Sequence, residues 1–308
     1  MKMDQLRQMV ELYQTGSINR AAANLFMSQP NLSQSIRRLE DELGCSLITR
    51  NNRGVSFTDK GKDFVLYAKD VLRQFDHLST IGQDPGAGTA CRTLSVSSMN
   101  YRPLVLLAAE FYRRFPPEEL RLILHEQDRD GVIDSVVNGD SEIGVLNMLS
   151  SYQKDLIKQL KGKGLRFTRL SDDIPVVLVS ERHPLYARGD FAKVTPADLA
   201  DFPLVRYSAM DQSHYSDKAH LVGITRTAGE IIVDTRSALH EILENTQAFA
   251  VVSYNEKLYR HFRYYPGTHR LLIEGCTLTH TFGWIMREDA TLSLLAKDFI
   301  QTLTAYFS

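Results

Sequence analysis

The chain has 308 residues, of which 43% are hydrophobic and 24% charged, and its formal net charge is −1. This length predicts two or three globular domains rather than one small module. The near-neutral charge excludes attraction to nucleic acid through the charge of the whole molecule, so any such attraction has to be local.

The first sixty residues predict three short helices. Apolar residues recur at helical spacing before Gly16, which ends the first helix. Ser17 is a favoured N-cap for a second helix and Ser28 for a third, in which Pro30 occupies the first turn, where its missing N–H costs nothing. The stretch Ser17–Leu47 therefore predicts a helix-turn-helix, a geometry that lays one helix in the major groove of DNA.

The third helix has a stripe of leucine and isoleucine on one side and a polar face on the other. Amides, hydroxyls and guanidinium groups read base edges or hold phosphates, although any surface helix also has a polar outer face. A two-stranded wing is expected from Arg50 to Thr58, turning at Arg53 and Gly54. The candidate DNA-binding residues are Ser28, Gln29, Pro30, Asn31, Ser33, Gln34, Arg37, Arg38, Arg50 and Arg53.

One set of residues follows a recognisable order and spacing without a gap: Ala21, Ala22, Leu25, Ser28, Gln29, Pro30, Leu32, Ser33, Ile36, Leu39, Glu40, Leu43, Gly44, Leu47, Arg50, Thr58 and Gly61. Through these residues the segment resembles the winged helix-turn-helix of LysR-type transcriptional regulators. Ile48 is a departure, because that family usually has Phe there, and the change alters core volume without touching the DNA-facing residues.

One long helix is expected from Thr58 to about Gly82, followed by a hinge at Gln83–Thr89, whose proline and glycines cannot continue a helix. Its apolar residues form a heptad seam, which either packs on its own domain or pairs with a second copy. A short N-terminal domain offers little surface to cover so long a seam, and the resembled family places its dimerisation helix here, so we favour self-association. The seam residues are Phe64, Ala68, Val71, Phe75 and Leu78.

The remainder predicts an α/β domain. Strands and helices alternate from Thr93 to Leu146, which favours a parallel sheet with helices on both faces, and a second unit of the same type begins near Leu165. The resemblance implies that the tail rejoins the first unit, giving two Rossmann-like lobes of periplasmic-binding-protein type. The expected domains are residues 1–58 for DNA binding, 59–90 for the linker helix and hinge, and 91–308 for effector binding, with lobe I at about 91–164 and 266–308 and lobe II at about 165–265.

Ligands of open α/β sheets bind at the carboxyl ends of strands, beside helix N-termini. That rule selects polar residues in both lobes, which otherwise serve only to cap helices and fill turns. The arginines among them favour an anionic effector, because a guanidinium pairs with a carboxylate in a bidentate fork. The candidate effector-binding residues are Ser97, Ser98, Asn100, Tyr101, Arg102, Gln127, Asp128, Arg129, Arg206, Tyr207 and Ser208.

No enzyme motif is complete in the sequence. The His240–Glu244 segment lacks the second histidine of a zinc-binding helix, and Ser151 with Lys154 matches SxxK spacing without the accompanying elements. We therefore expect no catalytic activity, no cofactor and no metal. The cysteines Cys45, Cys91 and Cys276 are scattered singly, which favours buried free thiols over a redox switch.

The sequence thus predicts an effector-responsive transcriptional regulator of LysR type that binds promoter DNA as a homodimer or homotetramer and acts on RNA polymerase. The alternative is a solute-binding or enzymatic α/β protein with an incidental helix-turn-helix. No apolar run has the length of a membrane span, and the first residues lack a secretory profile, so a cytoplasmic protein without membrane contact is expected.

Overall fold

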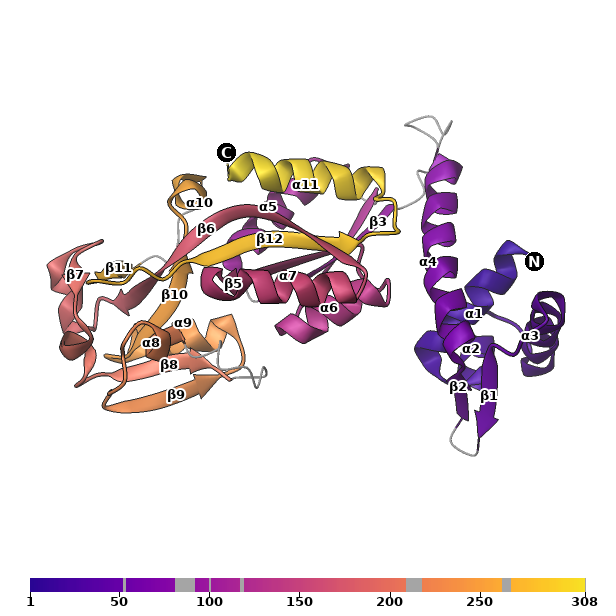
Figure 1. The fold of residues 1–308 in the computed structure, drawn as a ribbon, viewed down its shortest axis with the longest axis horizontal. Coiled ribbons are helices and arrows are strands. Elements are labelled where there is room, and N and C mark those ends of the chain that lie inside the picture. Colours follow the sequence, from indigo (N-terminus) through magenta and orange to yellow (C-terminus); the bar gives the residue numbers. More distant parts are fainter. Residues whose placement is uncertain are drawn as a thin grey trace. The chain divides into compact units, whose positions relative to one another are not determined.

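The structure is a computed structural model that describes residues 1–51, 54–80, 92–99, 101–116, 119–208, 218–261 and 267–307. These residues form two compact units, one made mainly of residues 1–92 and the other mainly of the later residues (Figure 1). The expected hinge at Gln83–Thr89 lies outside the described residues, as do Arg53, Cys91 and Asn100.

The N-terminal unit is a winged helix-turn-helix, as the sequence predicts. Ser17 and Ser28 cap the second and third helices by accepting hydrogen bonds from Arg20 N and Asn31 N, and Gly16 and Gly44 end helices in the left-handed conformation. Its elements are α1 (Met3–Thr15), α2 (Ile18–Asn24), α3 (Gln29–Leu43), β1 (Ile48–Asn51), β2 (Gly54–Phe57) and α4 (Asp59–Thr80), with β1 and β2 antiparallel.

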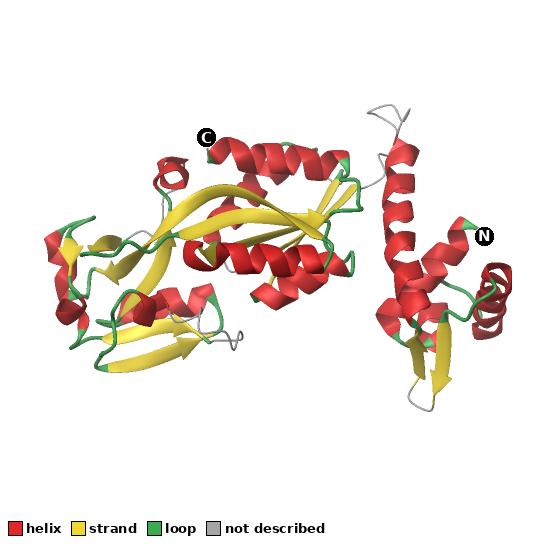
Figure 2. Ribbon diagram, in the orientation of Figure 1, coloured by secondary structure: helices red, strands yellow, loops and turns green. Residues whose placement is uncertain are grey.

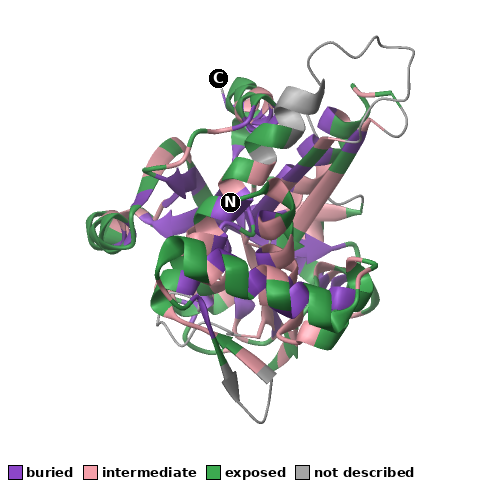
Figure 3. Cartoon of the chain, turned by 90° about the vertical axis from the view of Figure 1, so that its right-hand side faces the viewer, coloured by how far each residue is buried: buried purple, intermediate pink, exposed green. Residues whose placement is uncertain are grey.

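The core of this unit lies between its three short helices. Met9, Leu32 and Ile36 are buried there, and Ile48 at the start of β1 joins the same cluster. A Cβ atom at Gly61 would lie 1.9 Å from the Leu47 carbonyl oxygen, so only glycine lets α4 pass this close to the segment before β1. In Figure 3 the helices are exposed along their outer sides and buried along the sides that face the interior.

Helix α4 divides into two halves. Ala68 is 2% exposed and Phe64 packs against the core of the N-terminal unit, whereas Val71 and Phe75 are 47% and 42% exposed. The expected seam therefore does not run unbroken along one face, because α1 packs on α4 and covers its first turns. The exposed apolar stripe is Tyr67, Val71 and Phe75, and the side chain of Leu78 lies outside the described residues.

The second unit is a two-lobed α/β structure with a continuous, strongly twisted sheet (Figure 2). The strands follow the order β4-β3-β5-β12-β6-β10-β8-β9, and β11 pairs with β6 and β7. The sheet is mixed and not purely parallel, because β6 and β12 run antiparallel to their neighbours. Its strands are β3 (Arg92–Ser98), β4 (Leu120–Glu126), β5 (Ile143–Leu149), β6 (Leu165–Ser180), β7 (Lys193–Val194), β8 (Pro203–Tyr207), β9 (Gly229–Val233), β10 (Phe249–Tyr254), β11 (Thr268–Ile273) and β12 (His280–Arg287).

Helices cover this sheet in both lobes (Figure 1). They are α5 (Arg102–Tyr112), α6 (Arg129–Val137), α7 (Gln153–Gly162), α8 (Lys218–Leu221), α9 (Arg236–Asn245), α10 (Glu256–His261) and α11 (Leu294–Tyr306), with short 3-10 helices at Ser150–Tyr152, Pro184–Arg188 and Pro196–Leu199. Among the described helices, none combines the length and apolar character needed to cross a bilayer. Cys45 and Cys276 are free thiols of intermediate exposure, which corrects the expectation that they are buried.

Strand β6 belongs to both lobes. Its residues Leu165–Asp173 pair with β12 in lobe I, and its residues Ile174–Val179 pair with β10 in lobe II. Strand β11 pairs with the second part of β6, so residues 268–273 extend the sheet of lobe II instead of lobe I, and the chain returns to lobe I only after Ile273. Two crossovers thus join the lobes, as the resemblance implies.

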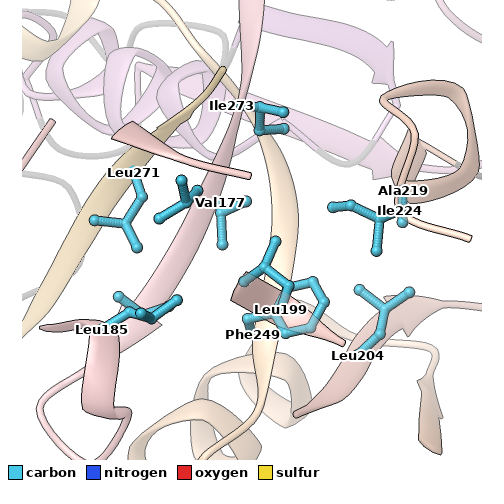
Figure 4. Packing of buried hydrophobic residues seen from close by; sticks show 11 residues of the cluster. Val177, Leu185, Leu199, Leu204, Ala219, Ile224, Phe249, Leu271 and Ile273 are labelled. Atoms are coloured by element: carbon cyan, nitrogen blue, oxygen red, sulfur yellow. The ribbon is translucent and has the colours of Figure 1, made fainter. Parts of the chain in front are cut away.

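Each lobe has its own core. In lobe II the apolar side chains of β6, β10 and β11, including Val177, Phe249 and Leu271, gather around Leu199 and Leu204 (Figure 4). In lobe I the helices α6 and α7 bury Val132 and Leu160 against Leu146, Leu165 and Ile285. The lobes are therefore separately packed bodies that share the strand β6.

Candidate functional site

The outer face of α3 carries most of the expected DNA-binding residues. Ser28 caps the helix at its N-terminus, and the exposed positions that follow are Gln29, Pro30, Asn31, Gln34, Arg37 and Arg38. Ser33 differs from the expectation, since it is 9% exposed and its hydroxyl accepts a hydrogen bond of 3.0 Å from Gln29 Nε2. It lies on the inner side of the helix, where it holds the Gln29 amide.

Hydrogen bonds fix α3 relative to its neighbours. Glu40 Oε1 accepts from the backbone N–H groups of Leu47 and Ile48, at 2.7 and 3.1 Å, and so holds the start of the wing. Ser35 donates to Gln8 on α1. The wing strands place Arg50 opposite Val55, while the Arg50 side chain lies outside the described part of the structure. Helix α3 is thus held rigidly with its polar side outward.

In lobe I most of the residues expected around an effector make hydrogen bonds or packing contacts within the folded domain. Ser97 is buried, with its Oγ 2.6 Å from Ser141 Oγ. The Tyr101 hydroxyl donates to Asp173 Oδ2 at 2.9 Å, and the Tyr101 ring stacks on Phe282 with centroids 4.2 Å apart. Ser98 is also buried. The hydroxyl groups of Ser97 and Tyr101 are therefore used in hydrogen bonds within the fold, at the end of β3, and do not line an open surface.

The expected residues in the turn between β4 and α6 are likewise hydrogen-bonded within the fold. Asp128 is the N-cap of α6 and accepts from Gly131 N at 2.8 Å. Gln127 accepts from the Ser135 hydroxyl at 2.9 Å, and its backbone N–H donates to the Ser98 carbonyl. The alternative interpretation, that these residues cap helices and fill turns, describes both of them.

In lobe II the expected residues have partners within the lobe. Arg206 forms an ion pair of 3.1 Å with Glu230 on the adjacent strand β9. The Ser208 hydroxyl donates to Asp234, and Tyr207 packs on a core cluster that includes Leu178 and Leu239. Arg206 is therefore occupied by a carboxylate of its own lobe.

The charged residues that connect the lobes lie at the start of α9. Arg236, whose side chain is 19% exposed, pairs with Glu126 at the end of β4 in lobe I. His240, one turn further along α9, has its pKa lowered to about 4, first by burial and then by the positive charges of Arg102 and Arg236. Arg102, the first residue of α5, was expected at the effector site, whereas Glu126, Arg236 and His240 were not.

Arg236 and His240 were missed because the strand β9 (Gly229–Val233) was not predicted, and Glu126 was missed because β4 extends to Glu126, beyond the predicted strand end at Leu124. The rule used for the prediction selects residues that follow the carboxyl ends of strands, so without β9 it did not select the loop before α9. The helix itself is predicted from the sequence over Arg236–Asn245, and Thr235, which caps α9 by accepting from Ala238 N at 3.2 Å, is the local signal that marks its start. The ion pair between Glu126 of β4 and Arg236 of α9 thus joins the two lobes, as does the hydrogen bond from Lys257 Nζ to the Phe307 carbonyl.

A helix-turn-helix with an exposed polar helix, followed on the same chain by two α/β lobes that meet through charged residues, defines the class of ligand-responsive DNA-binding regulators. Residues 3–62 match the family described as bacterial regulatory helix-turn-helix protein, lysR family, and residues 91–308 match the LysR substrate binding domain. The chain belongs to the LysR family of transcriptional regulators.

Similar proteins support this assignment. The chain is 30% identical over 208 residues to the HTH-type transcriptional regulator BsdA of Bacillus subtilis, covering 67% of this chain and 66% of BsdA. It is 26% identical over 222 residues to CysB of Haemophilus influenzae, covering 68% of this chain and 61% of CysB. The chain thus spans about two thirds of the length of these curated relatives.

Solved structures show the same fold. A full-length variant of OxyR from Pseudomonas aeruginosa matches with a TM-score of 0.63 at 20% identity, covering 100% of this chain and 94% of OxyR. Full-length CbnR in complex with its target DNA matches with a TM-score of 0.56 at 19% identity, covering 99% of this chain and 100% of CbnR.

Proposed function

We propose that this protein is a sequence-specific transcriptional regulator whose binding to promoter DNA is controlled by a small-molecule effector held between its two α/β lobes. The observation that carries the proposal is the polar outer face of α3, which is capped by Ser28 and joined to the wing through Glu40. CbnR, which has this fold, has been solved with its target DNA. The compartment that holds bacterial DNA, the cytoplasm, is the expected location.

The DNA-binding face offers two kinds of contact. The amides of Gln29, Asn31 and Gln34 suit base edges, because an amide pairs bidentately with adenine. Arg37 and Arg38 suit phosphates or guanine, and Arg50 and Arg53 of the wing suit the phosphate backbone. A single good bidentate base contact contributes about 1 to 3 kcal/mol of discrimination.

Two copies of the chain are needed to present two recognition helices to two half-sites on one face of DNA. The stripe of Tyr67, Val71 and Phe75 on α4 supports pairing through the distal half of this helix. A homodimer, or a homotetramer built from two of them, that acts on RNA polymerase is the assembly we propose.

We also propose that the protein has no catalytic activity. Its relatives include HTH-type transcriptional regulators. Within the described ranges, no three His, Cys, Asp or Glu side chains lie together in a way that could hold a metal ion.

The test begins with selection of the bound sequence from random DNA, followed by fluorescence anisotropy on the selected operator and on a scrambled duplex. Gln34→Ala should lower the ratio of specific to non-specific affinity by roughly 5- to 150-fold, since about 1 to 3 kcal/mol of discrimination is lost. Gln14→Ala, at an exposed glutamine on α1, is the matched control. Equal ratios for wild type and Gln34→Ala would remove this residue from base recognition, and failure to select any sequence would refute the function.

A further inference from the structure

The turn of the helix-turn-helix contains a strained phenylalanine. Helix α2 ends in a turn in which the Phe26 N–H donates to the Ala23 carbonyl at 3.1 Å and the Met27 N–H donates to the Ala22 carbonyl at 2.9 Å. These two hydrogen bonds form the Schellman pattern, which places a left-handed residue directly after the helix C-cap. Phe26 fills that position with a φ of 53°. The turn thus holds a bulky side chain in a conformation that favours glycine or asparagine.

Glycine fills the corresponding conformation at the other two helix ends of this motif. Gly16 and Gly44 end α1 and α3 with φ values of 61° and 66°. Phe26 and Phe191 are the only non-glycine residues with a positive φ in the part of the chain that the structure describes. A phenylalanine at position 26 therefore lowers the stability of the N-terminal unit, and backbone strain of this kind gathers at functional sites.

The side chain of Phe26 does not offset this strain by burial. Phe26 is 98% exposed, whereas Met27 beside it packs against the core of the N-terminal unit. The turn thus directs one apolar side chain inward and holds the next one outward. Because an apolar side chain stabilises a fold only when it leaves water, the Phe26 ring fits a contact with another molecule better than a role in the core.

Phe26 lies beside the end of α3 that is assigned to the DNA groove. It precedes the N-cap Ser28 by two residues, so their Cα atoms are at most about 7 Å apart. The recognition helix of a helix-turn-helix contacts base edges with its N-terminal residues. Gln29 and Asn31 are exposed at this end, so Phe26 extends the polar face of α3 with an apolar group. The apolar group that DNA presents in the major groove is the methyl group of thymine.

We propose that the Phe26 ring packs against the methyl group of a thymine in each half-site and so selects thymine at that position. The inference rests on the proposed function, to which it adds a specificity-determining residue that reads DNA without a hydrogen bond. DNA is favoured over a protein partner because the ring is continuous with the cap and the amides at the N-terminus of α3. Since Phe26 serves recognition at the expense of stability, replacing it should change these two properties in opposite directions.

The experiment uses the full-length protein and the operator selected from random DNA, with deoxyuridine replacing one thymidine at a time. Uracil pairs as thymine does and lacks only the methyl group. Fluorescence anisotropy should reveal one position in each half-site at which this exchange weakens wild-type binding about fourfold, the effect of one buried methyl group. Phe26→Asn should bind thymine and uracil equally there. Its thermal midpoint for the N-terminal unit should rise by roughly 4 to 8 °C, because asparagine tolerates the left-handed conformation.

Two further variants separate the apolar contact from the backbone strain. Phe26→Leu keeps an apolar side chain and the strain, so it should retain the preference for thymine over uracil without a gain in stability. Phe191→Asn is the matched control, because Phe191 is also a phenylalanine with a positive φ and is 38% exposed, but lies in the effector domain. This control should bind both operators as the wild type does.

Three outcomes would overturn the inference: equal wild-type binding of thymine and uracil at every position, an undiminished thymine preference in Phe26→Asn, or a lower thermal midpoint in that variant. If Phe26→Asn lowers transcription without changing operator binding, the ring contacts a protein and the inference is overturned as well. In each of these cases the response to Gln34→Ala on the same operator decides the proposed function separately. If the wild type selects no DNA sequence, the inference and the proposed function both fail.

Discussion

The hydrogen bond between Tyr101 and Asp173 gives a quantitative test of the packing of the effector domain. Asp173 is fully buried in β6, at the last position that pairs with lobe I, and it accepts from Tyr101 at 2.9 Å and from Asn255 Nδ2 at 2.8 Å. Tyr101→Phe removes one donor while it keeps the ring stacked on Phe282. We expect the free energy of unfolding to fall by about 1.5 to 3 kcal/mol, because a buried acceptor loses one of its donors.

The assay is urea unfolding followed by tryptophan fluorescence. The chain has one tryptophan, Trp284, which is 8% exposed and lies in β12 beside β6, so its emission reports this domain and not the N-terminal unit. A loss of about 1.5 to 3 kcal/mol lowers the thermal midpoint of a domain of this size by roughly 3 to 12 °C. Tyr112→Phe, at a tyrosine that is 46% exposed, is the matched control. A change below about 0.5 kcal/mol for Tyr101→Phe would mean that Asp173 does not depend on this donor.

Three further predictions concern other parts of the molecule. Gly61→Ala should destabilise the N-terminal unit by about 1 to 3 kcal/mol or more, because the added Cβ would lie 1.9 Å from the Leu47 carbonyl oxygen; circular dichroism during heating checks this, and an unchanged midpoint contradicts it. The double substitution Val71→Asp with Phe75→Asp should reduce the mass measured by light scattering to that of a monomer. It should not unfold the domain, because both side chains are exposed. An unchanged mass would refute pairing through the distal half of α4. His183 and His240 have pKa values lowered to about 4, mainly by burial. Because the unfolded chain therefore binds more protons than the folded chain below pH 6.5, the free energy of unfolding should fall as the pH drops from 6.5 towards 4. Equal urea midpoints at pH 7 and pH 5 would contradict this.

The N-terminal unit could be predicted almost completely because its signals are local. Ser28 sits next to the helix it caps, and Gly44 adopts the left-handed conformation that ends the same helix. Ser33 is the exception. Its hydroxyl suits an exposed face as well as a buried bond to Gln29, and only the packing of α3 decides between the two.

The effector domain was harder to predict because its decisive contacts are distant in sequence. The hydrogen bond from Tyr101 spans 72 residues, and nothing near Tyr101 indicates that its hydroxyl is used by Asp173. The double role of β6 depends on its pairing with β12 and β10, whose paired residues lie about 115 and 75 positions away in sequence. The alternation of strands and helices predicts the class of fold but not which strand crosses between the lobes.

The hydrogen bond of Tyr101 connects the candidate effector-binding residue Arg102 with β6, the strand that both lobes share. Tyr101 and Arg102 are consecutive, so their Cα atoms are about 3.8 Å apart and a displacement of one moves the other. Arg102 begins α5, and its positive charge contributes to the lowered pKa of His240 on α9, while Tyr101 is hydrogen-bonded to Asp173 on the strand that both lobes share. A ligand that draws Arg102 towards itself therefore acts on β6 through a single peptide bond and one buried hydrogen bond. It follows that Tyr101→Phe should weaken the effect of a bound effector on operator affinity more than it weakens effector binding itself, which anisotropy and calorimetry on the same variant can separate.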